Sequence, residues 1–240
     1  MRINRYLSLC GLGSRRKVED YILTKRIRVN GAIVEDLSFT VDTVNDIVEL
    51  DRGRLNLIKK LHYLILNKPR GYITAMSDSR GRPIVMDMIP AIYKKERIFP
   101  VGRLDKDTEG LLLFTNDGDM AYKLSHPKYH VTKVYIVKLD KPLKKSHEYK
   151  IEKGIYLYNR KTYPSQIDTL DISRQTIRMG MMEGRKRQIR MTFQGFGYRV
   201  EGLKRIAFGP LGLSGIGSGQ YRILTDREIK ALKEIVQIHE

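Results

Sequence analysis

GRLDKDTEGLLLFTNDG, residues 102–118, joins a polar loop bounded by glycines to an apolar run that follows it directly. The loop, residues 102–110, holds three carboxylates, two cations and a hydroxyl. The run 111–115 has the length and composition of a buried strand, and the turn residues Asn116-Asp117-Gly118 end it. A helix is predicted directly afterwards, over 119–124. The stretch therefore places several chemically active side chains on a loop that enters a sheet.

The residues of the acidic loop leave more than one interpretation open. A single aspartate in such a loop is most often a turn or helix-capping residue. Paired carboxylates also suggest glycosidase chemistry, in which one acid attacks and the other donates a proton. Asp105 and Asp107 are too close in sequence to face each other across a sugar ring, which argues against a glycosidase. The loop by itself does not fix an activity.

Residues 61–240 are expected to form one α+β domain around the strand at 111–115. Further strands are predicted over 63–66, 134–139, 166–170 and 176–179. Helices are predicted over 186–196 and from Thr225 onward, where Glu228 completes a capping box. Because strands outnumber helices and short turns join them, a mixed, largely antiparallel sheet flanked by helices is favoured over a doubly wound parallel sheet.

A separate, small α+β module is expected at the N-terminus, over residues 1–57. Apolar residues recur at helical spacing over 3–10, and Ser14 is a suitable N-cap for a second helix. Asn30-Gly31 between two short apolar runs predicts a tight hairpin, and 47–50 predicts a third strand. The polar, basic stretch 51–60 is interpreted as the linker to the second domain.

The charge of the chain indicates the class of its partner. The 240 residues include 45 Lys and Arg against 27 Asp and Glu, a net charge of +18. Such an excess favours a polyanion, nucleic acid first and an anionic membrane surface second. A hydrophobic share of 41% excludes wholesale disorder. Without a signal peptide or a run of about 18 apolar residues, we expect a soluble cytoplasmic protein.

The cysteine and histidine content argues against a metal centre. The single cysteine, Cys10, excludes an internal disulfide framework and a cysteine-based zinc site. His126 and His130 are four residues apart, but Pro127 between them argues against a shared helical face. No metal site is therefore predicted.

The basic start of the second expected helix is a candidate RNA-docking surface. At Gly13-Ser14-Arg15-Arg16-Lys17, backbone N–H groups, a hydroxyl and three cations could bind phosphate together, although a solvated basic face is the plainer interpretation. The wider pattern, through Leu7, Gly11, Ile22 and 27–31, resembles the S4 RNA-binding domain. That resemblance implies salt-sensitive docking on structured RNA. The expected contacts are Arg5, Ser14, Arg15, Arg16, Lys17 and Arg26.

The loop and strand at 102–118 resemble the main motif of the RsuA/RluB family of ribosomal RNA pseudouridine synthases. The similarity extends over essentially the whole chain in the family's order. It continues through 66–72, 81–83, 126–127, 133–135, 183–190, 203–205 and 209–211. The resemblance implies the pseudouridine synthase fold for residues 61–240, behind an N-terminal S4 domain over 1–57.

The family implies a specific reaction on uridine. The enzyme detaches uracil from C1′ of the ribose, rotates the base and rejoins it through C5. No redox cofactor, nucleotide or metal is implied, because the reaction is an isomerisation. Asp105 matches the family's essential aspartate, which acts covalently on either the ribose or the base. The target uridine must turn out of its stack into the site.

The resemblance also implies roles for other side chains. Arg190 matches an arginine that pairs with the aspartate and keeps it ionised. Tyr135 matches a tyrosine that stacks on the target base and helps to move a proton, and Leu203 an apolar residue packed against the site. From the residues alone, these three would be a solvated helix arginine, a strand aromatic and a core leucine. The expected substrate-binding residues are Arg103, Lys133, Arg187, Gln188, Lys204 and Arg205.

The chain departs from the family pattern after Arg190. Met191-Thr192 stand where Arg-Met is common, and Arg199 stands where proline is frequent, which puts the RNA-facing surface and target in question. The residues of the motif around Asp105 and Asp117 resemble large-subunit members more than small-subunit ones, which favours a 23S target over a 16S target. The alternative from another class is a non-catalytic S4-type RNA-binding or ribosome-assembly factor. The expected partner is ribosomal RNA or a pre-ribosomal particle, bound by a monomer without a membrane.

Overall fold

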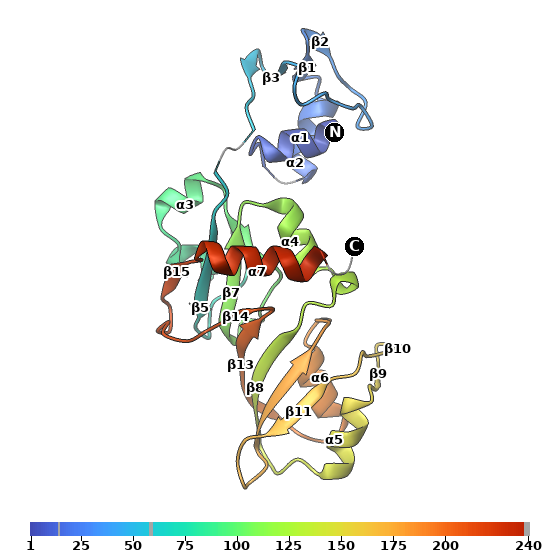
Figure 1. The fold of residues 1–240 in the computed structure, drawn as a ribbon, viewed down its shortest axis with the longest axis vertical. Coiled ribbons are helices and arrows are strands. Elements are labelled where there is room, and N and C mark those ends of the chain that lie inside the picture. Colours follow the sequence, from blue (N-terminus) through green and yellow to red (C-terminus); the bar gives the residue numbers. More distant parts are fainter. Residues whose placement is uncertain (14, 58–59, 238–240) are drawn as a thin grey trace.

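The computed structural model of the protein describes residues 1–13, 15–57 and 60–237 (Figure 1). Its N-terminal part packs two helices against a four-stranded sheet of order β2-β1-β3-β4. These elements are α1 (Ile3–Leu9), α2 (Arg15–Leu23), β1 (Ile27–Val29), β2 (Ala32–Ile33), β3 (Val48–Leu50) and β4 (Gly53–Arg54). Both expected helices and the third strand are confirmed, whereas the proposed N-cap, Ser14, lies outside the described residues.

The expected hairpin of the N-terminal part is confirmed. Arg28 pairs with Ile33 and Val29 with Ala32, and the turn residues Asn30 and Gly31 have φ of 51° and 81°. Both torsions lie in the left-handed region that a two-residue hairpin turn requires. The side chain of Asn30 also donates to Asp46 and accepts the Ile47 N–H, which joins the turn to the strand on its other side.

The first half of the expected linker at 51–60 belongs to the N-terminal sheet. Asp51 and Arg52 have φ of 50° and 68°, so the chain turns back and Gly53–Arg54 pairs with β3. Leu55 then packs against the N-terminal core. The polar composition that suggests a linker here comes from a second tight turn. Residues 58–59 lie outside the described part of the chain.

The rest of the chain is built on a nine-stranded sheet. Its main order is β11-β12-β8-β13-β7-β5-β15, with β14 added to β13 and β6 to β7. The bounds are β5 (Tyr63–Lys68), β6 (Phe99–Pro100), β7 (Glu109–Thr115), β8 (Lys133–Leu139), β11 (Gln166–Thr169), β12 (Thr176–Met181), β13 (Val200–Phe208), β14 (Leu211–Gly212) and β15 (Tyr221–Ile223). The central pair β13–β7 is parallel, and the other strand pairs of this sheet are antiparallel. The expected mixed, largely antiparallel sheet is confirmed.

Strand β13, the longest of the sheet, is absent from the sequence-based prediction. Its sequence, VEGLKRIAF, interrupts the apolar alternation with Gly202 and with three charged residues. One of them, Arg205, is nevertheless 2% exposed, at a position where periodicity predicts an apolar side chain. Because a buried cation takes one of the positions that are usually apolar, the sequence lacks the alternation that would predict this strand.

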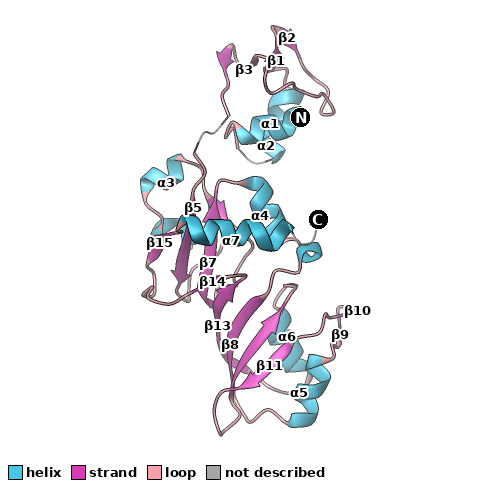
Figure 2. Ribbon diagram, in the orientation of Figure 1, coloured by secondary structure: helices cyan, strands magenta, loops and turns pink. Residues whose placement is uncertain are grey.

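Helices flank the sheet, as expected (Figure 2). They are α3 (Ala91–Lys95), α4 (Gly118–Ser125), α5 (Lys145–Glu152), α6 (Gln188–Gly195) and α7 (Asp226–Gln237), with 3₁₀ turns η1 (Val85–Met88) and η2 (Pro127–Tyr129) and a hairpin of β9 (Tyr156–Leu157) and β10 (Arg160–Lys161). Asp117 caps α4 by accepting the Met120 N–H. The capping box at the start of α7 is confirmed, because Thr225 and Glu228 exchange hydrogen bonds.

The sheet is buried on both sides in the region of β7. Leu112 and Phe114 belong to one apolar cluster, together with Phe193 of α6. Leu111 and Leu113 belong to a second cluster on the other face, which Leu232 and Val236 of α7 cover. Double-sided burial explains why 111–115 reads as a continuous apolar run. None of the helices formed by the described residues has the length and apolar character to cross a membrane.

Candidate active site

A cavity of about 590 Å³ lies where the central strands of the large sheet meet two loops. Tyr135 of β8 and Leu203 of β13 come from neighbouring antiparallel strands. The loop before β7 contributes Asp105, and the start of α6 contributes Arg187 and Arg190. Four segments that are distant in the sequence thus meet at the cavity, and each carries one of the motifs noted above.

The loop that carries Asp105 is fixed by hydrogen bonds along its length. Leu104 exchanges hydrogen bonds with the buried hydroxyl of Thr74, at 2.8 and 3.2 Å. The Gly71 N–H donates to the Lys106 carbonyl at 2.9 Å, and the Thr108 N–H closes a turn onto the Asp105 carbonyl at 3.0 Å. The half-buried side chain of Asp105 remains free to point into the cavity. A backbone held this firmly gives the carboxylate a defined position.

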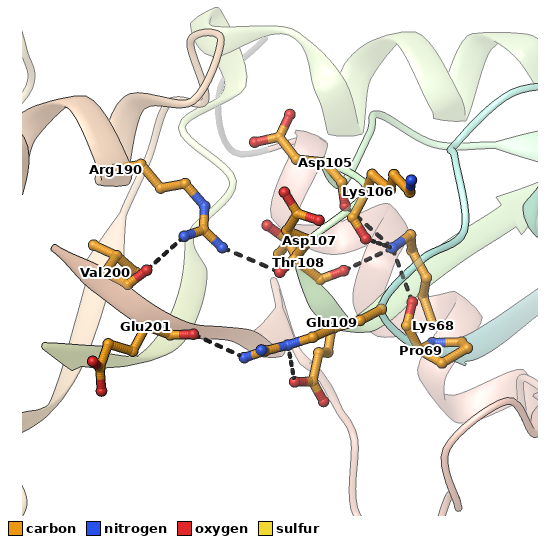
Figure 3. A network of polar contacts seen from close by, with 11 residues as sticks. Lys68, Pro69, Asp105, Lys106, Asp107, Thr108, Glu109, Arg190, Val200 and Glu201 are labelled. Atoms are coloured by element: carbon orange, nitrogen blue, oxygen red, sulfur yellow. Dashed lines mark hydrogen bonds and ion pairs between the residues drawn. The ribbon is translucent and has the colours of Figure 1, made fainter. Parts of the chain in front are cut away.

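Beneath the loop lies Lys68, whose side chain is fully buried at the end of β5. Its ammonium donates to four backbone carbonyls, those of Pro69 at 3.0 Å, Asp105 at 3.1 Å, Lys106 at 3.3 Å and Thr108 at 2.7 Å. Figure 3 shows this fan of contacts, with the Asp105 carboxylate directed away from Lys68. No site role is predicted for Lys68 from the sequence. The position of this lysine, at the end of an apolar strand and before a proline, is a pattern that could have indicated a buried, functional side chain.

Burial lowers the pKa of Lys68 from 10.5 to about 8, against the opposing effect of Asp107, Asp105 and Glu109. Between these two values the unfolded chain holds a proton that the folded protein has released. Unfolding then takes up a proton, so the contribution of Lys68 to the free energy of unfolding rises as pH increases from about 8 to 10.5. The rise attributable to Lys68 is about 3 kcal/mol.

We expect Lys68→Met to remove this part of the pH dependence. Urea unfolding from about pH 7.5 to 10 measures the slope for wild type, for Lys68→Met and for Lys138→Met, a control that changes an exposed lysine of β8. The control should keep the wild-type slope. Equal slopes for wild type and Lys68→Met would show that Lys68 has an ordinary pKa in the folded protein.

Arg190 of α6 reaches the same loop, but not through the expected ion pair. Its guanidinium donates to the Val200 carbonyl at 2.8 Å and to the Asp107 carbonyl at 3.1 Å. Within the described residues it forms no ion pair with Asp105, so the expected direct pairing is not present. The two carbonyls accept from its terminal nitrogens, and the buried Nε has no hydrogen-bond partner among the described residues. Burial lowers the pKa of Arg190 and Arg187 adds to this, whereas Asp107 and Asp105 raise it.

Tyr135 and Leu203 form the apolar wall of the cavity. They are 7% and 6% exposed, and both belong to the larger apolar cluster of the sheet. In the β8–β13 pairing, Leu203 lies opposite Val137, and Tyr135 lies opposite Arg205. The ring and the leucine occupy diagonal positions on the same face of the two strands and provide an apolar surface of the kind on which a nucleobase can stack.

The six expected substrate-binding residues do not all reach the same place. Arg103 is exposed at the edge of the cavity, and Arg187, the residue just before α6, has a left-handed φ of 51°. Lys133 and Arg205 line a second, adjoining cavity of about 270 Å³. Lys204 lines neither cavity, because side chains alternate along β13 and its neighbours Leu203 and Arg205 face the site.

Gln188, also expected to bind substrate, uses its amide within the protein. The amide donates to the Glu183 carboxylate at 2.8 Å and accepts the Arg185 N–H at 2.9 Å. Arg185 in turn contacts Glu183 at 3.1 Å and donates to the carbonyls of Leu157, Arg160 and Lys161. These contacts fasten the β9–β10 hairpin beside the cavity. Glu183 and Arg185 lie in a motif noted from the sequence, but neither is among the expected catalytic or substrate-binding residues.

The predicted RNA-binding side chains of the N-terminal part are spread over its surface. Arg16 and Lys17 are exposed on the first turn of α2, and Lys17 lies 5.7 Å from the Tyr21 ring centre. Arg5 pairs with Asp119 of α4, and Arg26 pairs with Asp51. Exposed pairs of this kind are weak, so they leave both arginines available to phosphate. Ser14 and the side chain of Arg15 lie outside what the structure describes.

Comparison with known proteins finds one family for each part of the chain, and both agree with the resemblances noted from the sequence. Residues 62–195 match the family described as RNA pseudouridylate synthase, and residues 1–48 match the S4 domain. The protein named ribosomal large subunit pseudouridine synthase B of Bacillus subtilis (strain 168) is 40% identical over 238 residues. The match covers 98% of this chain and 96% of that relative.

Two further similarities cover nearly the full length. A protein of Aquifex aeolicus (strain VF5) named uncharacterized RNA pseudouridine synthase is 38% identical over 239 residues, covering 98% of this chain and 95% of the relative. A crystal structure of a pseudouridylate synthase matches with a TM-score of 0.72 at 29% identity, covering 97% of this chain and 99% of the other. The fold and the order of motifs are therefore shared from end to end.

Proposed function

The chain belongs to the RNA pseudouridylate synthase family and carries an S4 domain, and from this premise we infer that it converts a uridine of ribosomal RNA to pseudouridine. The observation that carries the proposal is the placement of one carboxylate, Asp105, in a cavity walled by Tyr135 and Leu203. A loop that Lys68 and Arg190 hold from two sides presents that carboxylate.

Asp105 is the nucleophile of the proposed reaction. It attacks either the ribose or the base, the N1–C1′ bond breaks, and the base turns within the site. A bond then forms between C5 and C1′, the bond to Asp105 breaks and returns the carboxylate, the proton at C5 leaves, and N1 gains a proton, so atoms and charge balance. Because Arg190 binds the loop through the Asp107 carbonyl, its charge stays close to Asp105 without blocking the carboxylate. Tyr135 stacks on the base and assists the late proton transfer.

The substrate enters the cavity as a uridine turned out of its stack. About 590 Å³ accommodates a nucleotide, and the rim of the cavity carries Arg103 and Arg187, whose charges suit the neighbouring phosphates. The name of the Bacillus subtilis relative supports the large ribosomal subunit as the source of the target RNA. We propose that the protein acts in the cytoplasm as a monomer, with residues 1–57 and 61–240 as its two domains.

Mapping of pseudouridine across ribosomal RNA tests this function. Carbodiimide-dependent primer-extension stops are compared in RNA made with and without the protein. The expected result is that one stop in 23S RNA, or a few neighbouring ones, is lost without the protein and returns with it. A stop that changes in 16S RNA instead would move the target to the small subunit. RNA with no changed stop would favour a non-catalytic S4-type binding factor.

Removal of residues 1–57 tests the proposed docking role of the S4 domain. The large sheet has two apolar clusters of its own, so we expect residues 61–240 to remain folded. Affinity for the RNA substrate should fall and become less dependent on salt, since each lost phosphate contact reduces the magnitude of the slope of log K against log salt by about 0.7 to 0.9. Filter binding from about 50 to 300 mM KCl gives the slope. An unchanged slope would rule out phosphate docking by this domain.

A further inference from the structure

The second cavity, of about 270 Å³, adjoins the active-site cavity along β8 and β13. The two cavities share Arg103, Tyr135, Gly184 and Arg185 in their walls. Tyr135 and Lys133 are two residues apart on β8 and therefore face the same side of the sheet. A group bound in the second cavity would consequently lie next to a uridine stacked on Tyr135.

The inner wall of this cavity holds two buried cations from neighbouring strands. Lys133 is 9% exposed and Arg205 is 2% exposed. Both lie over the ring of Phe208, with Lys133 Nζ 5.5 Å and the Arg205 guanidinium carbon 5.1 Å from its centre. Lys133 donates to the Val131 carbonyl, and Arg205 donates through Nε to the Leu111 carbonyl. Nη2 of Arg205 is buried, and none of the described residues accepts a hydrogen bond from it.

No carboxylate of the described residues forms an ion pair with either cation. Glu183 lines the same cavity, but its carboxylate already binds Arg185, the Gln188 amide and the Tyr163 N–H. Glu183 and Arg185 therefore offset each other, and the charges of Lys133 and Arg205 remain. Burial and, to a smaller extent, the neighbouring Arg205 lower the pKa of Lys133 to about 8, against the influence of Glu183.

Two buried like charges that form no ion pair repel each other in the free protein, and an anion bound between them would offset this repulsion. We propose that this cavity is a phosphate subsite, which binds a phosphodiester of the RNA strand directly beside the target uridine. This inference rests on the proposed function. Nη2 of Arg205 and the Lys133 ammonium are two donors for the two non-bridging oxygens of one phosphodiester. With less than half of the volume of the first cavity, the second suits a phosphate better than a further nucleotide.

The RNA arm of the test compares Lys133→Met with Lys138→Met, which removes the same charge from the exposed face of the same strand. The RNA is a fragment that contains the uridine identified by mapping, with and without a neutral methylphosphonate at each flanking linkage. For wild type, one flanking methylphosphonate should weaken binding about tenfold. With Lys133→Met, the methylphosphonate should no longer weaken binding, and the slope of log K against log salt should be smaller in magnitude by about 0.7. Lys138→Met should keep the methylphosphonate effect and the salt slope at the wild-type values.

The second arm uses inorganic phosphate and needs no RNA. Phosphate should raise the melting temperature of wild type above that in chloride of equal ionic strength, and should raise it less for Lys133→Met and for Arg205→Met. Without phosphate, Lys133→Met should melt no lower than wild type, because it relieves repulsion. Arg205→Lys keeps the charge and should keep most of the phosphate effect if Arg205→Met fails to fold.

The outcomes separate the subsite from the proposed function. The proposed subsite would be wrong if phosphate raised the melting temperature equally in wild type and Lys133→Met and if the methylphosphonate weakened RNA binding equally in both. A marked fall in the melting temperature of Lys133→Met without phosphate would also overturn it, because Lys133 would then be a structural residue. If mapping finds no pseudouridine while the phosphate shift depends on Lys133, the anion site stands and its assignment to this reaction is wrong.

Discussion

Asp105→Asn is expected to slow pseudouridine formation by a factor of about 10⁴ or more, with little change in stability. Asparagine has nearly the shape of aspartate but is no nucleophile at this position, and the half-buried side chain supports no described hydrogen bond of the fold. Lys68 and the Thr108 N–H bind the backbone carbonyl of residue 105, which the substitution keeps. The loop should therefore stay in place while the chemistry stops.

Release of tritium from RNA that contains 5-tritiated uridine measures this effect, because the reaction removes the hydrogen at C5. Asp107→Asn is the matched control. It neutralises an exposed carboxylate two residues further on, and the carbonyl that binds Arg190 remains, so activity should fall by less than about tenfold. If Asp105→Asn retains wild-type activity, or if Asp107→Asn is the more damaging change, the nucleophile is assigned wrongly.

Gly110→Ala should destabilise the protein by about 4 kcal/mol. Gly110 has a φ of +106°, which L side chains rarely adopt, and it lies beside Arg205 in the parallel pairing of β7 with β13. A Cβ at this position would meet the carbonyl oxygen of Arg205 and lie 2.8 Å from its backbone nitrogen. Backbone atoms within a sheet cannot move aside, so the two strands would have to separate.

Chemical unfolding in urea gives the size of this effect, and Gly118→Ala is its control. Gly118 lies beyond the other end of β7, at the first position of α4, where an added methyl group would have no neighbouring atom within 4 Å. Its replacement should leave stability unchanged or raise it by up to about 1 kcal/mol. A Gly110→Ala protein as stable as wild type would mean that β7 and β13 are less closely apposed than the structure indicates.

Local signals account for the parts of the fold that the sequence predicts. The continuous apolar run of β7, the capping residues of α4 and α7, and the Asn30-Gly31 turn each act within a few residues, and all of these elements form as expected. β13 escapes prediction because its strand character depends on partners in β7 and β8, which are distant in the sequence. A buried arginine facing a cavity has no periodic signature that distinguishes it from a surface residue.

In the candidate site, too, local sequence signals predict some features and tertiary contacts decide the others. The motif that carries Asp105 is recognisable because its residues are contiguous, and the structure places Tyr135, Arg190 and Leu203 around the same cavity. The partners of each side chain are decided by tertiary contacts instead. Lys68 binds carbonyls of a distant loop, and Arg190 binds two carbonyls where a carboxylate partner is expected. Every residue has a backbone carbonyl, so the sequence does not indicate which carbonyl a buried lysine or arginine will bind.

The parallel pairing of β7 with β13 has a consequence for the order of events in synthesis. Asp105 and Lys68 belong to the first half of the sheet, whereas Tyr135, Arg190 and Leu203 belong to the half that ends with β13. Two register pairs, together with the hydrogen bonds of Arg205 to Leu111 and Arg190 to Asp107, join these halves. A nascent chain that has not yet produced residues 200–208 holds Asp105 and Tyr135 but lacks Leu203 and the strand that joins the two sides. The two sides of the proposed site are thus joined only when a nearly complete chain closes its own sheet.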